Sequence, residues 1–234
     1  MSALIFPPPV TIGAGAAAAS ADWNTVDWDS ATEVTSGAYD SAASTINGES
    51  VSLVTKASTH GAPDAGLNAG GLWVPITLSN TAFGLAFEIT FSGGFTGGLT
   101  TSDIGFVLCL ADTNSEVQDK GIYAGMTART SSGGSYRPVA GYLGYTQGNG
   151  SMVAMTPTEM HGALLLANSK GVVASSTTFN SVGPRDPHAV HNRMTDALGT
   201  SLYLGLLPIV VPTGASAVTM AITSVKWAAI TAPS

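Results

Sequence analysis

Apolar and polar residues alternate with a period of two over several short stretches of the chain. The clearest stretch is 85–91, where Leu, Phe, Ile and Phe occupy the odd positions and Ala, Glu and Thr the even ones. Because successive side chains of a strand point to opposite faces, this pattern predicts a strand with one buried and one solvated face. A similar alternation over 72–78 includes Pro75, which predicts a strand at a sheet edge or with a bulge.

Two further signals predict strands in the middle of the chain. Residues 104–110 are apolar in both phases, which predicts a central strand covered on both sides. Residues 121–129 and 137–145 contain aromatic residues and glycines and flank the Ser/Gly-rich run 131–135. Two such runs around a turn predict a β-hairpin.

The last third of the chain predicts two more strand pairs. Residues 162–167 and 170–175 flank an Asn-Ser turn, and residues 201–207 and 217–227 are expected to form the final pair around the Pro- and Gly-containing segment 208–214.

Two local features interrupt this regular pattern. The apolar phase changes by one residue within 218–227, which predicts a β-bulge near Thr223 and Ser224. Residues 156–166 begin with a Thr-Pro pair that resembles a helix start, with Glu three residues after the Thr, so we expect one or two helical turns there.

The overall pattern predicts an all-β fold. About ten short strands at spacings of roughly 8–12 residues are typical of an antiparallel β-sandwich or jelly roll of the lectin-like kind. All-β domains of this size form single units, so we expect one domain over residues 21–234. Residues 1–20 are predicted to be an extended arm, because three consecutive prolines precede a Gly/Ala stretch with no face to bury. Its apolar tip, Leu4, Ile5 and Phe6, is expected to anchor in a neighbouring subunit.

Composition narrows the range of partners. Charged residues make up only 10% of the chain, well below the roughly 25% that is usual. Neutral polar surfaces favour assembly, because few charges must be desolvated when two such surfaces meet. The eight basic residues are scattered and the net charge is −7, which disfavours nucleic acid and anionic membranes as partners. No apolar run approaches the ~20 residues of a membrane span.

Few residues suggest chemistry. Asp112, Asn114 and Glu116 place oxygen atoms at alternate positions, as calcium loops do, but the glycine of an EF-hand loop is absent. We expect a solvated loop, with calcium binding as the alternative. His188 and His191 lie among prolines and predict an exposed, subunit-facing loop, with metal binding or acid/base chemistry as the alternative.

The remaining sequence indicates neither catalysis nor a cofactor. Cys109 is the only cysteine, which excludes an internal disulfide and predicts a small core residue. No Gly-x-Ser-x-Gly motif exists to present a nucleophilic serine. We therefore predict a protein that is not an enzyme, with no cofactor and no required metal.

Aromatic residues offer one set of candidate ligand contacts. The ring of an exposed tryptophan or tyrosine can stack on a sugar, although such side chains are more often simply buried. The residues considered for this role are Trp23, Trp28, Trp73, Tyr142 and Tyr145.

The low charge, the Gly/Ser/Thr/Ala-rich composition, the proline-interrupted apolar arm and the closing strands over 201–227 together resemble accessory virion proteins of tailed bacteriophages. These families include head decoration proteins, head spikes or fibres, and tail-tip proteins. The resemblance implies a location in the virion and a homo-oligomer, with a trimer favoured, attached to a capsid or tail protein. It extends over the whole chain in style and includes no diagnostic motif.

Two alternatives remain open from the sequence. The first is a carbohydrate-binding module that recognises a cell-surface glycan through the aromatic residues named above. The second is a glycan-processing enzyme on the same sandwich, which would require two acidic side chains about 5–10 Å apart in a groove.

Overall fold

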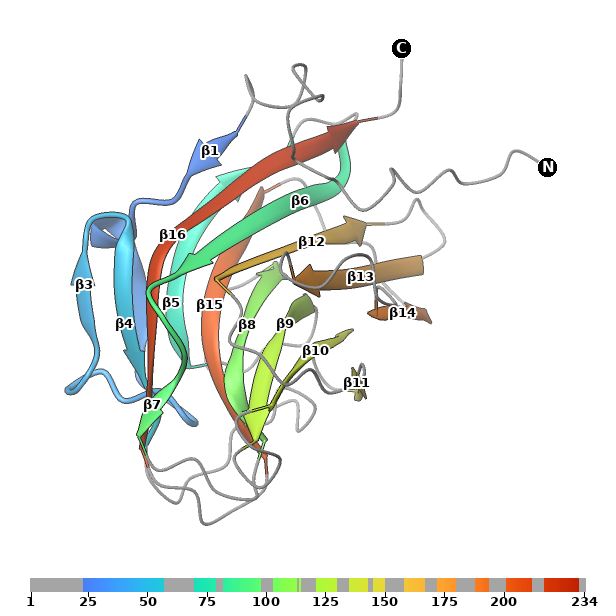
Figure 1. The fold of residues 1–234 in the computed structure, drawn as a ribbon. Helices are drawn as coiled ribbons and strands as arrows, with labels where there is room; N and C mark the ends of the chain where they lie inside the picture. Colours follow the sequence, from blue (N-terminus) through green and yellow to red (C-terminus); the bar gives the residue numbers. More distant parts are fainter. Residues whose placement is uncertain are drawn as a thin grey trace.

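The strands of the chain form two antiparallel sheets (Figure 1), which confirms the predicted all-β sandwich. The computed structural model describes residues 23–56, 70–78, 82–97, 103–112, 114, 121–129, 135–142, 145–149, 158–166, 172–179, 188–193, 201–211 and 217–231. A single turn of 3-10 helix, η1 (Trp28–Ser30), is the only helix in these ranges. The described residues include no helix long and apolar enough to cross a membrane.

The nine-stranded sheet is named sheet A. Most of its strands follow one another in a continuous order, the main path, and the short strands β1 and β7 pair with β16 outside that order. The main path runs in the order β14 (His188–Arg193), β13 (Val172–Phe179), β12 (Glu159–Leu166), β6 (Ala82–Phe91), β16 (Val218–Thr231), β4 (Ser50–Val54) and β3 (Thr45–Asn47), with β1 at Asn24–Thr25 and β7 at Thr96–Gly97.

Sheet B has seven strands. They lie behind sheet A in the view of Figure 1. Their order is β11 (Tyr145–Asn149), β10 (Ser135–Tyr142), β9 (Gly121–Arg129), β8 (Asp103–Ala111), β15 (Ser201–Val211), β5 (Gly71–Thr77) and β2 (Thr32–Val34).

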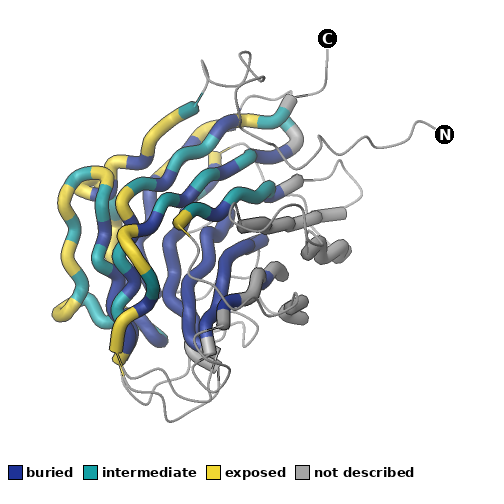
Figure 2. Tube along the Cα trace, viewed as in Figure 1, coloured by how far each residue is buried: buried dark blue, intermediate teal, exposed yellow. Residues whose placement is uncertain are grey.

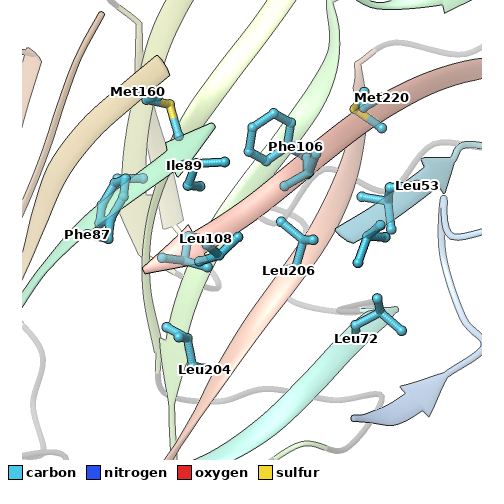
Figure 3. Packing of buried hydrophobic residues seen from close by; sticks show 14 of the residues in the cluster. Leu53, Leu72, Phe87, Ile89, Phe106, Leu108, Met160, Leu204, Leu206 and Met220 are labelled. Carbon is cyan, nitrogen blue, oxygen red and sulfur yellow. The ribbon is translucent and has the colours of Figure 1, made fainter. Parts of the chain in front are cut away.

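The inner faces of the two sheets share one hydrophobic core. Figure 3 shows Phe87 and Ile89 of β6 in this core together with Phe106 and Leu108 of β8. Burying each such side chain is worth roughly 1.5–3 kcal/mol, so this face-to-face contact is the main stabilising interaction of the sandwich. The alternation over 85–91 is confirmed, since the odd positions are buried and the even ones are intermediate, as the alternating colours of β6 in Figure 2 show.

Sheet B is buried on both faces over its central strands. Every residue from Ile104 to Ala111 of β8 is buried, which confirms the prediction for 104–110. The even positions of this strand contribute to the shared core, and the odd ones to a second apolar cluster on the outer face of sheet B. That cluster includes Cys109, which confirms it as a core residue.

The predicted β-bulge is confirmed. The pairing of β16 with β6 shifts register between Ile222 and Ser224. Val218, Met220 and Ile222 are buried before the shift, and Val225 is buried after it. The extra residue therefore keeps both halves of a long strand facing the same core, as the phase change in the sequence required.

The predicted hairpin and the predicted pairing of 162–167 with 170–175 are also confirmed. Strands β9 and β10 pair antiparallel, as do β12 and β13. At Pro75, β5 is paired by β15 alone, because β2 pairs only with Gly71–Trp73. This is the edge-like position predicted for that proline.

The prediction of a helix over 156–166 is wrong. Residues Glu159–Leu166 form β12, which pairs with β6 on one side and β13 on the other. Met160 and Leu164 are buried, and pairing with β6 and β13 satisfies the backbone hydrogen-bonding groups on both edges of β12. The Thr-Pro helix-start signal acts only locally, and strand pairing on both sides of this segment outweighs it.

Two further expectations are corrected by the pairing. Residues 201–207 and 217–227 do not form a strand pair, because β15 belongs to sheet B and β16 to sheet A. The segment that contains His188 and His191 is not a loop, since it forms β14 and pairs with β13. A strand that carries polar residues can be recruited to a sheet edge because only one of its sides must be paired.

Candidate functional site

The predicted anchor residues and several predicted ligand residues lie outside the described part of the chain. Leu4, Ile5, Phe6 and Glu116 are in this group, and the side chains of Tyr142 and Tyr145 are too. The anchor arm, the tyrosine platforms and the calcium loop therefore stay predictions. Among the described residues, no group of three His, Cys, Asp or Glu side chains could hold a metal ion.

Two of the proposed tryptophan platforms are wrong. Trp28 and Trp73 each have 0% exposed area, so neither ring can stack on a ligand. Trp28 begins η1 and packs in the shared core, and Trp73 packs in the outer cluster of sheet B. Burial of the large indole surface outweighs the advantage of leaving the ring exposed for a ligand.

The structure brings four ionisable side chains together on the outer face of sheet A. His161 of β12, Glu88 of β6 and Lys226 of β16 are paired in register, so they form one row across three strands. Glu159 lies two residues before His161 on the same face of β12. We call these four residues the charged row.

Each member of the charged row contacts another member. Glu88 Oε1 lies 3.7 Å from Lys226 Nζ, and Glu88 Oε2 lies 3.8 Å from His161 Nδ1. The Nε2 atom of the same imidazole lies 3.4 Å from Glu159 Oε2. The imidazole of His161 therefore stands between two carboxylates, and one of these carboxylates also meets an ammonium group.

Exposure differs along the row. The side chains of Glu88 and His161 are 19% and 16% exposed, whereas those of Glu159 and Lys226 are 41% and 42% exposed. The row is thus half-buried at its centre and open at its ends, where a partner can reach it.

Small and hydroxyl-bearing residues border the row on the same face. On one side, Ala163, Ala86 and Ala228 are paired in register across the same three strands. On the other side, Thr90 is paired with Ser224. Thr223 Oγ1 donates a hydrogen bond to the Thr90 carbonyl oxygen (3.1 Å), and Ser224 Oγ lies 3.4 Å from Thr90 Oγ1.

Trp23 retains partial exposure beside this face. It directly precedes β1, in which Thr25 pairs with Lys226. Alternation continued by one residue puts Trp23 on the same side as Thr25 and opposite Ala228. Its Nε1 atom is buried, so the N–H does not contribute to the exposed area of the residue.

Sequence reasoning missed most of the charged row. It placed Glu88 on a solvated strand face, which is confirmed, but it saw no partner for this residue. The i, i+2 spacing of Glu159 and His161 was an available signal, since it puts both side chains on one face of a strand. The wrong helix assignment for 156–166 concealed it.

Comparison with known proteins does not identify a family for this chain. No family model matches the sequence, and no curated protein matches it. Among solved structures, an engineered GH43 glycoside hydrolase is 13% identical with a TM-score of 0.47, over 88% of this chain and 40% of that one. Peanut lectin is 9% identical with a TM-score of 0.45, over 91% and 100% of the two chains.

A phage protein is among these structures. The CBM2 module of the evolved Dit of Lactobacillus casei BL23 phage J-1 is 12% identical with a TM-score of 0.38, over 91% of this chain and 99% of that one. This chain spans only about two fifths of the glycoside hydrolase. Similarity at this level decides neither family nor function. The two sheets themselves define the class, which is an antiparallel β-sandwich.

Proposed function

We propose that this protein is a structural accessory component of a virus particle, attached to a capsid or tail. It acts through contacts with other proteins and with copies of itself, with a trimer favoured. The supporting observation is the arrangement of charge on the outer face of sheet A.

The four central strands of this sheet, β4, β16, β6 and β12, carry few ionisable residues. Only Glu88, Glu159, His161 and Lys226 occur in them, and these four contact one another. Burying an isolated charge against another protein is costly, whereas a paired and hydrogen-bonded charge costs less. A face with paired charges and mainly Ala, Ser and Thr elsewhere suits a protein-protein contact.

The charged row contributes little to the stability of the monomer, so its arrangement needs another explanation. Ion pairs with partners exposed to this extent typically contribute between 0 and about 1 kcal/mol. Their effect on an interface is larger, because pairing within one protomer removes the need for the partner to supply complementary charges.

A catalytic role is a weaker proposal for the same residues. Glycoside cleavage needs two carboxylates that flank the bond to be broken, with the substrate and a water or nucleophile between them. Here the two carboxylates of the row, Glu88 and Glu159, are separated by the ring of His161, which contacts both. The imidazole occupies the space in which a substrate would have to lie.

Electron microscopy and mass spectrometry of particles purified from the native source test the proposal. We expect this chain in purified particles at a fixed stoichiometry, located on the capsid or tail in symmetric copies. Light scattering of the isolated protein should give an oligomer rather than a monomer. Absence of the chain from purified particles would contradict the proposal.

A further inference from the structure

We propose that the outer face of sheet A also binds a neutral oligosaccharide, at a site that extends from Trp23 to the charged row. This inference goes beyond a structural role and applies to copies of the chain whose outer face is not covered by another protein. It combines a partly exposed tryptophan, an ion-paired polar row and bordering hydroxyl groups on one sheet face.

The indole supplies the apolar part of the site. Trp23 is partly exposed and its Nε1 atom is buried, so the indole N–H is not part of the exposed surface. The carbon face of an indole stacks on the apolar C–H face of a sugar ring, and this contact needs no hydrogen bond from the indole. By alternation the residue opposite Trp23 is Ala228, whose methyl group is too short to cover the ring.

The charged row supplies the polar part. Carboxylate oxygens accept hydrogen bonds from sugar hydroxyls, and an ammonium group donates to them; such charge-assisted bonds are stronger than neutral ones. Glu88 and Lys226 are held in place by each other, at 3.7 Å. A ligand that binds them therefore meets groups whose orientation is already restricted, which lowers the entropy cost of binding.

Spacing and charge decide the class of ligand. Trp23 lies beside β16 opposite Ala228, and Glu88 lies on the next strand opposite Lys226. Two strand spacings across the sheet and two residues along it, roughly 12 Å in all, therefore separate their backbones. One sugar ring does not bridge this distance, whereas a short oligosaccharide does. The two carboxylates outnumber the single ammonium group, which disfavours uronates, sialic acids and sulfated sugars.

The test uses the full-length protein on a printed array of neutral and acidic oligosaccharides, followed by titration calorimetry with the best binder. We expect binding to a neutral oligosaccharide, weakened at least tenfold by W23A and several-fold by E88Q. W23F keeps a ring and should retain more affinity than W23A. T45A, on the exposed edge strand β3 of the same sheet, is the matched control and should bind as the native protein does.

Circular dichroism melting of each variant separates lost binding from lost folding. Affinity that falls in folded W23A and E88Q while T45A is unchanged would support the site. No binding on the array, binding confined to acidic sugars, or native affinity in both W23A and E88Q would each overturn it. Because particle attachment is measured separately, this failure would leave the structural proposal standing.

Discussion

Trp73 illustrates why single residues were difficult to place from the sequence. It pairs in register with Gly205 on β15, and a Cβ atom at position 205 would lie 2.4–2.7 Å from three atoms of the indole ring. The ring thus lies over Gly205, because any residue with a Cβ atom at this position would clash with it. Nothing near either residue in the sequence indicates the other, so burial of this tryptophan was not predictable.

Cys109 allows a prediction at the same scale. Complete burial raises the pKa of its thiol well above the ordinary value. The folded protein therefore keeps the proton at alkaline pH, whereas the unfolded chain loses it above about pH 8.5. The stability linked to this thiol is fully present below that pH and declines as the pH rises. We expect the free energy of unfolding to fall by about 1 kcal/mol between pH 7.5 and 9.5 from this group.

Urea unfolding of the native protein and of C109A at the two pH values measures this effect. The variant lacks the thiol but keeps every other titrating group, including Tyr39, whose pKa is also raised by burial. It should lose about 1 kcal/mol less than the native protein over this interval. Equal losses in the two proteins would show that Cys109 ionises in the folded state as it does when unfolded.

At the scale of elements, periodicity predicted those strands well that are long and keep one face against the shared core along their whole length. β6, β8 and the bulged β16 belong to this group, because each is long and packs on the shared core. β12 does not, since its even-numbered inner positions include Gly162, and its Thr-Pro-Thr-Glu start resembles a helix cap. Its identity as a strand depends on β6 and β13, which pair with it from distant parts of the sequence.

Deletion of Thr223 tests the bulge. Without the extra residue, the part of β16 after position 222 shifts by one, and Val225 must turn from the core to solvent or the first half of the strand must do so. Loss of several buried side chains should reduce the free energy of unfolding by at least about 3 kcal/mol. Denaturant unfolding followed by circular dichroism measures the change.

The matched variant is T223A. It keeps the residue count and removes only the exposed hydrogen bond from Thr223 Oγ1 to the Thr90 carbonyl oxygen. We expect a loss of no more than about 1 kcal/mol. If the deletion were as mild as T223A, the extra residue would not be needed to keep β16 in phase.

At the scale of the whole molecule, the pairing of strands brings together residues that are far apart in the sequence. Strand β16 lies between β6 and β4, and β15 lies between β8 and β5, although β15 and β16 are consecutive. This crossing between sheets places the C-terminal Lys226 beside Glu88, which also contacts His161 on its other side, and sequence distance alone would not have suggested this. The charged row is a product of topology.

The arm over residues 1–20 carries the prediction that belongs to this scale. A variant that lacks it should remain a soluble, β-rich protein, because described residues between Val26 and Val225 already form a continuous core. It should no longer join its particle, since we expect Leu4, Ile5 and Phe6 to provide the anchor. Circular dichroism and mass spectrometry of purified particles from complemented infections measure the two outcomes.

A full-length variant, L4D/F6D, removes the apolar character of the tip without shortening the chain. It should be lost from particles to the same extent as the deletion variant, because burying two carboxylates in an apolar site of the neighbouring subunit is unfavourable. Normal incorporation of either variant would contradict the anchor.

The sequence by itself determined that the chain folds into short strands, that one face of 85–91 and both faces of 104–110 are buried, and where β16 needs an extra residue. Each of these follows from the two-residue period of a strand, a local property of the backbone. Tertiary structure alone decided which strands are neighbours, and with them the burial of Trp73 over Gly205 and the contact of His161 with Glu88. Pairing is selected by burial of the whole core, which no local segment determines.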